Sequence, residues 1–207
     1  MFSIYRNNRN FEIRGNCSFL RTDYEMQSID KEEADRAFKL NKKQYLDTLL
    51  KSKGFLKYKT NAYVRRNQVD VLEYIDLQKE KNGSRTFTVN FCLTALYIPR
   101  KFFNWDYNQR LGMLICQKDI WWDFANDTIA KVSFENVAKA IEGFVIPWFD
   151  ARSNDDSIKN MLLDESEDDG WNRSSNQAWL DVIDHRYNLS ETIEENIELF
   201  GLPKSLS

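Results

Sequence analysis

The strongest pattern in the chain is an alternation of hydrophobic and polar positions between Arg85 and Ile98. Every second position is apolar, namely Phe87, Val89, Phe91, Leu93, Ala95 and Tyr97. Because successive side chains of a strand point to opposite faces of a sheet, this period of two predicts a strand with one face on a core. Asn82-Gly83 directly before it is typical of a hairpin turn, so we expect antiparallel pairing with the preceding strand.

Further strand-like segments lie on both sides of this one. Residues 55–66 and 69–78 are each predicted to form a strand, and with the strand after Arg85 they make a meander. Two short apolar runs, 110–116 and 119–124, are interpreted as a fourth and a fifth strand.

Helical spacing of apolar residues flanks the strands. One helix is expected to begin at Asp30, which together with Glu33 resembles a capping box, and to end at Gly54, with a break near Leu40 left open. A second is expected from an N-cap at Ser133 to Pro147 as terminator. Two more are expected near the C-terminus, one around Trp179 and one from Ser190 to Gly201.

This order of elements predicts an α+β fold, in which an antiparallel meander of four to five strands is packed by an N-terminal helix and C-terminal helices. We divide the chain into three parts. Residues 1–29 form an extension or a small hairpin around Gly15-Asn16, residues 30–150 form the α+β core domain, and residues 151–207 form an acidic helical segment packed on the core.

The amino-acid composition excludes several kinds of active site, whereas it says less about the fold. The 207 residues include one His, 3 Cys and 7 Gly, and no GxGxxG, P-loop or GxSxG motif occurs. Most His-based sites, multi-His zinc sites among them, are therefore excluded, and we predict no catalytic residue, no metal ligand and no cofactor. Widely spaced cysteines, no apolar stretch of 18 residues and no signal-peptide pattern lead us to expect a cytoplasmic protein without a membrane span.

Charge is unevenly distributed along the chain. Residues 150–207 hold 14 Asp and Glu against 5 Lys and Arg, so the C-terminal part is strongly acidic. One interpretation is a solvated loop that keeps the protein soluble, and the other is a docking face for a basic partner. The second interpretation assigns partner binding to the densest acidic stretch, with the residues Asp164, Glu165, Glu167, Asp168 and Asp169.

Aromatic residues gather after the meander, and they offer a second candidate for partner binding. In Trp121-Trp122, one indole is expected to enter the core, while the other is covered or exposed, because neighbouring strand residues face opposite ways. An exposed indole makes a binding hot spot, since it buries a large area at small entropic cost. We therefore add Trp105, Tyr107 and Trp122 to the candidate partner-binding residues; the alternative is that these side chains are covered.

A polar sheet face gives an alternative site for a small ligand. Gln78, Asn90 and Arg110 would recognise a carboxylate or phosphate if they lie together, through amide and guanidinium groups. The competing interpretation is structural, with Gln78 and Asn90 bonded across strands and Arg110 paired with Asp119 or Asp123. Single-stranded nucleic acid is a third and less favoured ligand, because the lysines at 51–59 lack the strand signature of an RNA-recognition sheet.

Several short motifs resemble one known family when they are taken together and in order. They are Lys51-Ser52-Lys53-Gly54-Phe55, Tyr63 to Arg66, Asp76-Leu77-Gln78-Lys79, Phe87-Thr88-Val89-Asn90, Arg110-Leu111-Gly112 and Asp119-Ile120-Trp121-Trp122. Across about residues 40–150 the chain resembles the bacterial domain-of-unknown-function 4304 family. Glu80 stands where the family usually has Ser after Gln-Lys, which weakens the transfer of any ligand role to that position.

The resemblance implies a small α+β protein with an antiparallel sheet, no established activity and no catalytic residues to carry over. Some members of the family lie in bacterial toxin–immunity neighbourhoods. We therefore expect a non-enzymatic bacterial protein that binds another protein, with the role of an immunity protein that neutralises a basic toxin. The alternative is a ligand-binding or enzymatic domain that uses the polar sheet face.

Overall fold

The computed structural model describes residues 5–7, 10–12, 30–164, 173–185 and 189–206. The chain divides into two compact units, each assembled from three separate stretches. The first unit comprises Met1–Leu49, Leu77–Val89 and Gln109–Val145. The second comprises Leu50–Asp76, Asn90–Asn108 and Ile146–Ser207.

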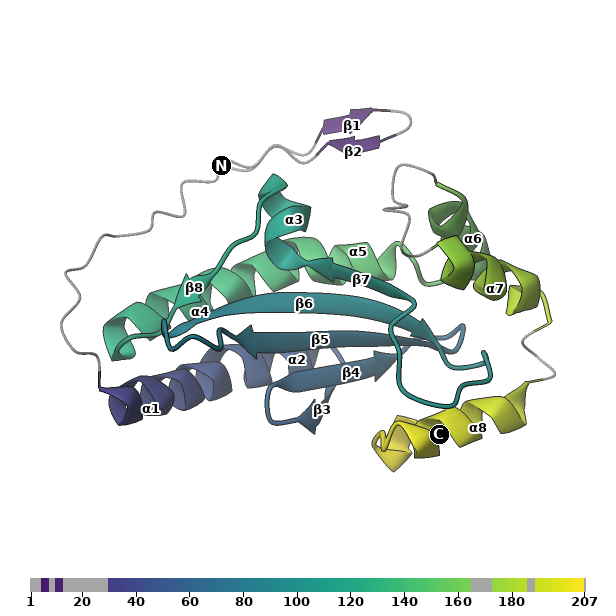
Figure 1. The fold of residues 1–207 in the computed structure, drawn as a ribbon. Helices are drawn as coiled ribbons and strands as arrows, with labels where there is room; N and C mark the ends of the chain where they lie inside the picture. Colours follow the sequence, from purple (N-terminus) through teal and green to yellow (C-terminus); the bar gives the residue numbers. More distant parts are fainter. Residues whose placement is uncertain (1–4, 8–9, 13–29, 165–172, 186–188, 207) are drawn as a thin grey trace. The chain divides into compact units, whose positions relative to one another are not determined.

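The strands confirm the predicted antiparallel meander (Figure 1). Within the described residues, a six-stranded sheet has the order β3-β4-β5-β6-β7, with β8 paired to β6. Its strands are β3 Leu56–Lys59, β4 Ala62–Arg66, β5 Val71–Lys79, β6 Thr86–Ala95, β7 Tyr107–Arg110 and β8 Trp122–Asp123. A separate antiparallel pair joins β1 Tyr5–Asn7 to β2 Asn10–Glu12, whereas the predicted Gly15-Asn16 turn lies outside the described residues.

The helices lie before, between and after the strands, as an α+β fold requires (Figure 1). They are α1 Lys31–Asn41, α2 Thr48–Ser52, α3 Leu111–Cys116, α4 Asp127–Ala140, α5 Ile146–Asp150, α6 Asp155–Leu163, α7 Arg173–Ile183 and α8 Ser190–Leu199. A π-helical segment, Lys42–Asp47, joins α1 to α2, and another, Ile141–Val145, joins α4 to α5. The first of them follows directly after Asn41, beside the position where a break was left open.

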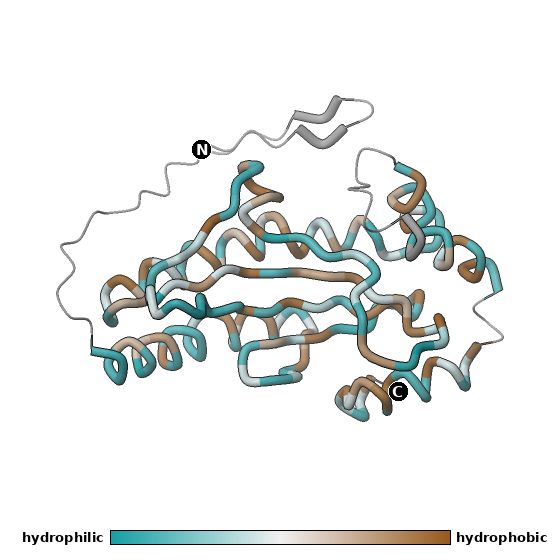
Figure 2. Tube along the Cα trace, viewed as in Figure 1, coloured by the Kyte–Doolittle hydropathy of each residue, from teal (hydrophilic) through white to brown (hydrophobic). Residues whose placement is uncertain are grey.

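An aromatic cluster forms the core of the first unit. The ring of Phe38 on α1 lies edge-on to Phe87, Phe124 and Phe134, with centroid distances of 5.3, 4.9 and 5.1 Å. All four side chains are buried, and edge-to-face geometry is favourable for aromatic pairs. Along α1, hydrophobic stretches recur among hydrophilic ones (Figure 2), and the buried residues Ala34, Ala37, Phe38 and Asn41 lie at helical spacing, as expected of a helix with one buried face.

In the second unit, the C-terminal helices are bonded to the segment that follows β6. The indole Nε1 of Trp179 on α7 donates to the Tyr97 hydroxyl at 2.6 Å, and both side chains are fully buried. The Asn196 amide on α8 donates to the carbonyls of Leu96 and Ile98, at 2.7 Å each. Asn196 therefore satisfies two backbone carbonyls just beyond the end of β6, while the buried indole N–H of Trp179 finds its acceptor in a buried hydroxyl.

Two predictions about the strands were wrong. Residues 111–116 form α3 and not a strand, because Leu111 and Ile115 are buried at helical spacing; a short apolar run is ambiguous between the two structures. Residues 55–66 form the two strands β3 and β4 and not one.

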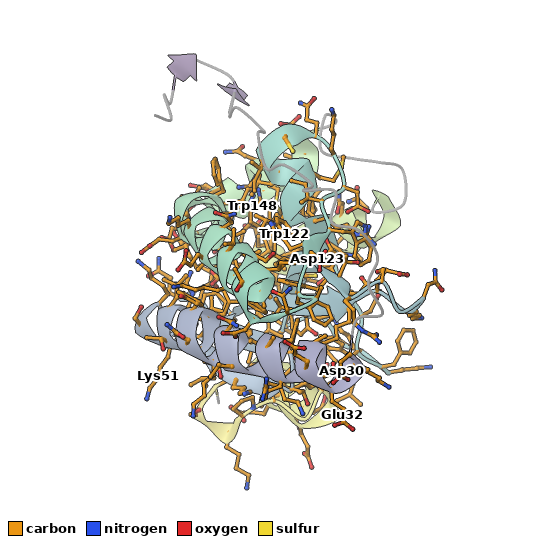
Figure 3. The ribbon with its side chains drawn as sticks, turned by 90° about the vertical axis from the view of Figure 1, so that its left-hand side faces the viewer. Asp30, Glu32, Lys51, Trp122, Asp123 and Trp148 are labelled. Carbon is orange, nitrogen blue, oxygen red and sulfur yellow. The ribbon has the colours of Figure 1, made fainter. Side chains whose placement is uncertain are left out.

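The boundaries of two helices also differ from their predictions. Asn126 caps α4 by accepting from the Ile129 N–H, while Ser133, the predicted cap, is buried inside the helix. Asp30 does cap α1, but its carboxylate accepts from the Glu32 N–H at 2.9 Å and not from Glu33 (Figure 3). The prediction that Pro147 terminates its helix was wrong, because Pro147 lies inside α5, which continues to Asp150. It comes just after the second π-helical segment, which fits the inability of proline to donate in a regular helical ladder.

Replacing Asn196 by Ala is expected to lower the free energy of unfolding by about 1–3 kcal/mol, because the buried Leu96 carbonyl and the partly buried Ile98 carbonyl would lose their donor. Asn196 is only 2% exposed, so water cannot readily replace the amide. Chemical denaturation of Asn196→Ala measures the loss. Asn160→Ala, at an exposed position of α6, is the matched control and should change stability little; equal effects of the two substitutions would contradict the prediction.

Candidate binding surface

A loop between β6 and β7 is held in place at several points. We call residues 99–106 the aromatic loop, because it contains Phe102, Phe103 and Trp105. Asp106, 3% exposed, pairs with Arg100 and accepts from the Ala95 N–H at 2.8 Å. Its own N–H donates to the Leu93 carbonyl at 3.2 Å. Both ends of the loop are therefore fixed by buried hydrogen bonds and an ion pair.

The aromatic loop also covers the end of β6 on the face that alternation predicts to be exposed. Thr94 is fully buried, and its hydroxyl donates to the Asn104 carbonyl at 3.3 Å. Alternation alone predicts that Thr94 lies on the face away from the core. That expectation was wrong for this end of β6, because the returning loop covers the strand.

The aromatic loop presents one side chain to solvent and packs the other two. Phe102 is 71% exposed. The ring of Trp105 lies 3.9 Å from that of Tyr74 on β5, and the ring of Phe103 lies 4.6 Å from that of Phe200. Phe102 therefore projects into solvent from a loop whose other two rings are packed on residues of the same unit.

A row of polar side chains crosses β5, β6 and the first residues of β7 in the second unit. The Asn90 amide donates to the Asp76 carboxylate at 3.1 Å, and the Cys92 thiol donates to the Asn108 side-chain carbonyl at 3.2 Å. Asn90 and Cys92 are alternate residues of β6 and so share a face. Tyr74 and Asp76 share a face of β5 for the same reason.

Burial raises the pKa of two titratable side chains in this row, Asp76 on β5 and Cys92 on β6. Desolvation raises the pKa of Asp76, and the hydrogen bond from Asn90 offsets part of the rise. Burial, and then the charge of Asp76, raise the pKa of the Cys92 thiol well above its usual value. Cys92 therefore stays a thiol and lacks the thiolate character of a catalytic nucleophile.

The predicted aromatic residues take different positions. Trp105 is partly exposed and packs on Tyr74. Tyr107 is 7% exposed and lies against Trp148, with 5.5 Å between their centroids. Trp122 is 6% exposed and lies near the Phe87 ring, so it is the indole of its pair that enters the core (Figure 3). Tyr107 and Trp122 are core residues here, and we leave both out of the surface proposed below.

Trp121, the other indole of that pair, is partly exposed in the first unit. It lies under the guanidinium of Arg110, 5.5 Å from the ring centroid, and its Nε1 donates to Asp119 at 3.3 Å. The two tryptophans therefore face different surroundings, as alternation in a strand predicts.

The predicted ligand-binding residues have separate partners. Arg110 pairs with Asp119 in the first unit, as the structural interpretation expected. Asn90 belongs to the second unit and bonds Asp76, a residue that the prediction did not include. Gln78 lies in the first unit and is partly exposed. Asp76 shares the strand parity of Gln78, so parity alone would have placed it on the same face.

The predicted acidic surface is described only at its start. Asp164 is exposed at the end of α6, whereas Glu165, Glu167, Asp168 and Asp169 lie outside the described residues. Asp155 and Asp156 fall in the first turn of α6, where negative charge is favoured by the helix dipole. The lysines considered for nucleic acid lie on α2, β3 and the turn between them; Lys51 is exposed (Figure 3).

Three further features of the described residues concern a surface hollow, metal binding and membrane spans. A surface hollow of about 440 Å³ in the second unit is lined by Arg66, Asn67, Gln68, Ser205 and Leu206, which do not belong to the polar row. Among the residues described, no group of three or more His, Cys, Asp or Glu is placed to hold a metal ion. In the same part of the chain, no helix is both long and apolar enough to cross a membrane.

A comparison with models of known protein families gives a match. A family model described as "Domain of unknown function (DUF4304)" matches residues 46–151. No curated protein and no solved structure matches the chain.

Proposed function

Because the chain belongs to a family whose description is a domain of unknown function, DUF4304, we propose its function from geometry: it binds another protein through the aromatic loop and catalyses no reaction. The observation that carries this proposal is the 71% exposure of Phe102. Phe102 is the most exposed of the large hydrophobic side chains among the described residues, and covering its ring with a partner would be favourable.

The anchoring of the loop supports the same proposal. Binding costs the entropy of ordering whatever moves in the free protein. The ion pair of Asp106 with Arg100 and the packing of Trp105 on Tyr74 order the aromatic loop before any partner arrives. Phe102 then requires little reorganisation to act as an anchor, which is typical of binding hot spots.

The chemistry of the polar row favours binding over catalysis. Cys92 is kept as a buried thiol. Arg110 already has a carboxylate partner in Asp119, which removes a reason to assign it to a ligand. The ligand-binding or enzymatic alternative based on Gln78, Asn90 and Arg110 therefore has less support than protein binding.

A role as an immunity protein is a finer form of this proposal. In it the protein acts in the cytoplasm of a bacterium, and the partner is a basic toxin whose approach is accelerated by the acidic C-terminal part. The charge of residues 150–207, with 14 Asp and Glu against 5 Lys and Arg, is the feature that supports it.

The aromatic loop is tested by Phe102→Ala. The full-length wild-type chain and the variant are immobilised and exposed to extract of the source organism, and any retained protein is purified and titrated against both. We expect the variant to bind the retained protein at least about thirtyfold more weakly, the effect of losing a hot-spot residue.

Leu163→Ala is the matched control, since Leu163 is 64% exposed in the same unit but lies on α6. It should bind like the wild type. Equal affinity of Phe102→Ala and the wild type, or turnover of a small molecule by the purified chain, would refute the proposal.

A further inference from the structure

Glu73, Asp76 and Asp106 are three buried or partly buried acidic side chains of the second unit, and among the described residues Asp76 is the one of the three that has no arginine partner. Glu73 and Asp106, 1% and 3% exposed, are each paired with an arginine. Asp76 is partly exposed, and within the described residues it forms no ion pair and accepts one hydrogen bond, from the neutral Asn90 amide. A desolvated carboxylate without a counter-ion costs free energy, so a cation bound at this position would be stabilising.

We propose that Asp76 is the counter-ion for an arginine or lysine side chain of the bound protein, which it holds against the sheet beside the aromatic loop. This inference rests on the proposed function and specifies the chemistry of the partner. Asn90 donates to Oδ1 of Asp76 and so orients the carboxylate, while Oδ2 accepts no hydrogen bond from the described residues.

The surroundings of Asp76 suit a cation with a flat or alkyl body. Tyr74 precedes it by two residues and lies on the same face of β5. Desolvation by burial, and then the charge of the nearby Asp76 carboxylate, raise the pKa of the Tyr74 hydroxyl, and the Trp105 ring lies 3.9 Å from the Tyr74 ring. Aromatic faces attract Arg and Lys cations, and the attraction grows when water is excluded.

The position also connects the cation site to the aromatic loop. Trp105 belongs to that loop and packs on Tyr74, which shares its strand face with Asp76. A partner that covers Trp105 would therefore reach the face of β5 that carries Asp76. Charge complementarity decides the occupant, because a neutral side chain would leave the carboxylate without a counter-ion.

The test uses a small probe, so it does not depend on identifying the partner. The ¹⁵N-labelled full-length protein is titrated with N-acetyl-arginine methylamide and, separately, with the neutral isostere N-acetyl-citrulline methylamide. We expect the arginine probe to shift the side-chain amide of Asn90 and the indole of Trp105 in a saturable way. The citrulline probe should bind at least about tenfold more weakly, since it lacks the charge.

Asp76→Asn is expected to weaken binding of the arginine probe at least about tenfold, while Asp156→Asn, at an exposed carboxylate of the same unit, is the control and should not change it. Equal binding of the arginine and citrulline probes would overturn the inference. So would unchanged arginine binding by folded Asp76→Asn, or the absence of shifts at Asn90 and Trp105. If Asp76→Asn fails to fold, the comparison of the two probes on the wild type still decides.

Failure of this inference and failure of the proposed function give different results. The probe comparison depends on Asp76 and not on Phe102, so Phe102→Ala should bind the arginine probe like the wild type. If Phe102→Ala loses the partner protein but the probes bind equally, the aromatic loop is supported and the cation site is refuted. If the protein prefers the arginine probe but Phe102→Ala retains its partner, the cation site is supported and the role of the aromatic loop is refuted.

Discussion

Replacing Arg65 by Met is expected to lower the free energy of unfolding by about 3–5 kcal/mol at neutral pH, the usual cost of removing one partner of a buried ion pair. Arg65 bonds the carboxylate of Glu73, which is 1% exposed. It also donates to the Lys53 carbonyl and to Asp150, at 3.0 Å each. The substitution would therefore leave a carboxylate in the core without its cation.

The loss should depend on pH in a defined direction. Burial raises the pKa of Glu73, and Arg65 offsets part of that rise. Without Arg65, the folded-state pKa rises further above the unfolded value, so the folded state binds a proton more readily than the unfolded state does. The destabilisation is then fully expressed above the raised pKa and shrinks as the pH falls through it toward the unfolded value.

Denaturant unfolding at pH 7 and at pH 5 measures both effects of Arg65→Met. The double variant Arg65→Met with Glu73→Gln should recover part of the lost stability, because the buried carboxylate is then absent. Arg36→Met, at an exposed position of α1, is the matched control. A loss for Arg65→Met below about 1 kcal/mol, or one that grows on acidification, would contradict the role assigned to Arg65.

Replacing Phe38 by Ala is expected to cost about 3–5 kcal/mol, the range for truncating a buried aromatic residue. Phe38 is 1% exposed and contacts the rings of Phe87, Phe124 and Phe134. The Lys79 ammonium lies 4.0 Å above the Phe38 ring and 2.8 Å from the Asp35 carboxylate. The cavity left by the ring would therefore also remove a cation–π contact.

The loss is measured by chemical denaturation of Phe38→Ala. Leu40→Ala is the control on the same helix, since Leu40 is 54% exposed and should cost little. Phe38→Leu should fall between the two, because it restores most of the apolar volume without the ring. Similar losses for Phe38→Ala and Leu40→Ala would show that the Phe38 cluster is not the core of the first unit.

Sequence patterns that extend over a few neighbouring residues predicted β6 and the end of the first helix correctly. The alternation after Arg85 predicted β6, because side chains of a strand alternate between two faces. Gly54 predicted the end of the first helix and has a φ of +83°, a conformation that glycine adopts without strain. By contrast, Leu111 and Ile115 lie in an apolar run too short to separate helix from strand.

The candidate surface was harder to predict, because it depends on which aromatic residues the fold leaves uncovered. Sequence reasoning chose Trp105, Tyr107 and Trp122 as partner-binding residues, but Phe102 is the aromatic side chain of this region that is 71% exposed. Phe102 and Phe103 are identical neighbours in one loop, and no local rule says which one packs. The position of Phe200, nearly 100 residues later in the chain, decides it, since the Phe103 ring lies against it.

The sequence by itself determined the class of fold and the elements with the clearest patterns, because periodicity and capping residues act over a few positions. Tertiary structure decided the rest. It gave Asp106 and Glu73 their arginines and left Asp76 with the neutral amide of Asn90. Counter-ions and burial come from residues distant in sequence, so only the folded chain determines which polar groups are satisfied and which remain available to a partner.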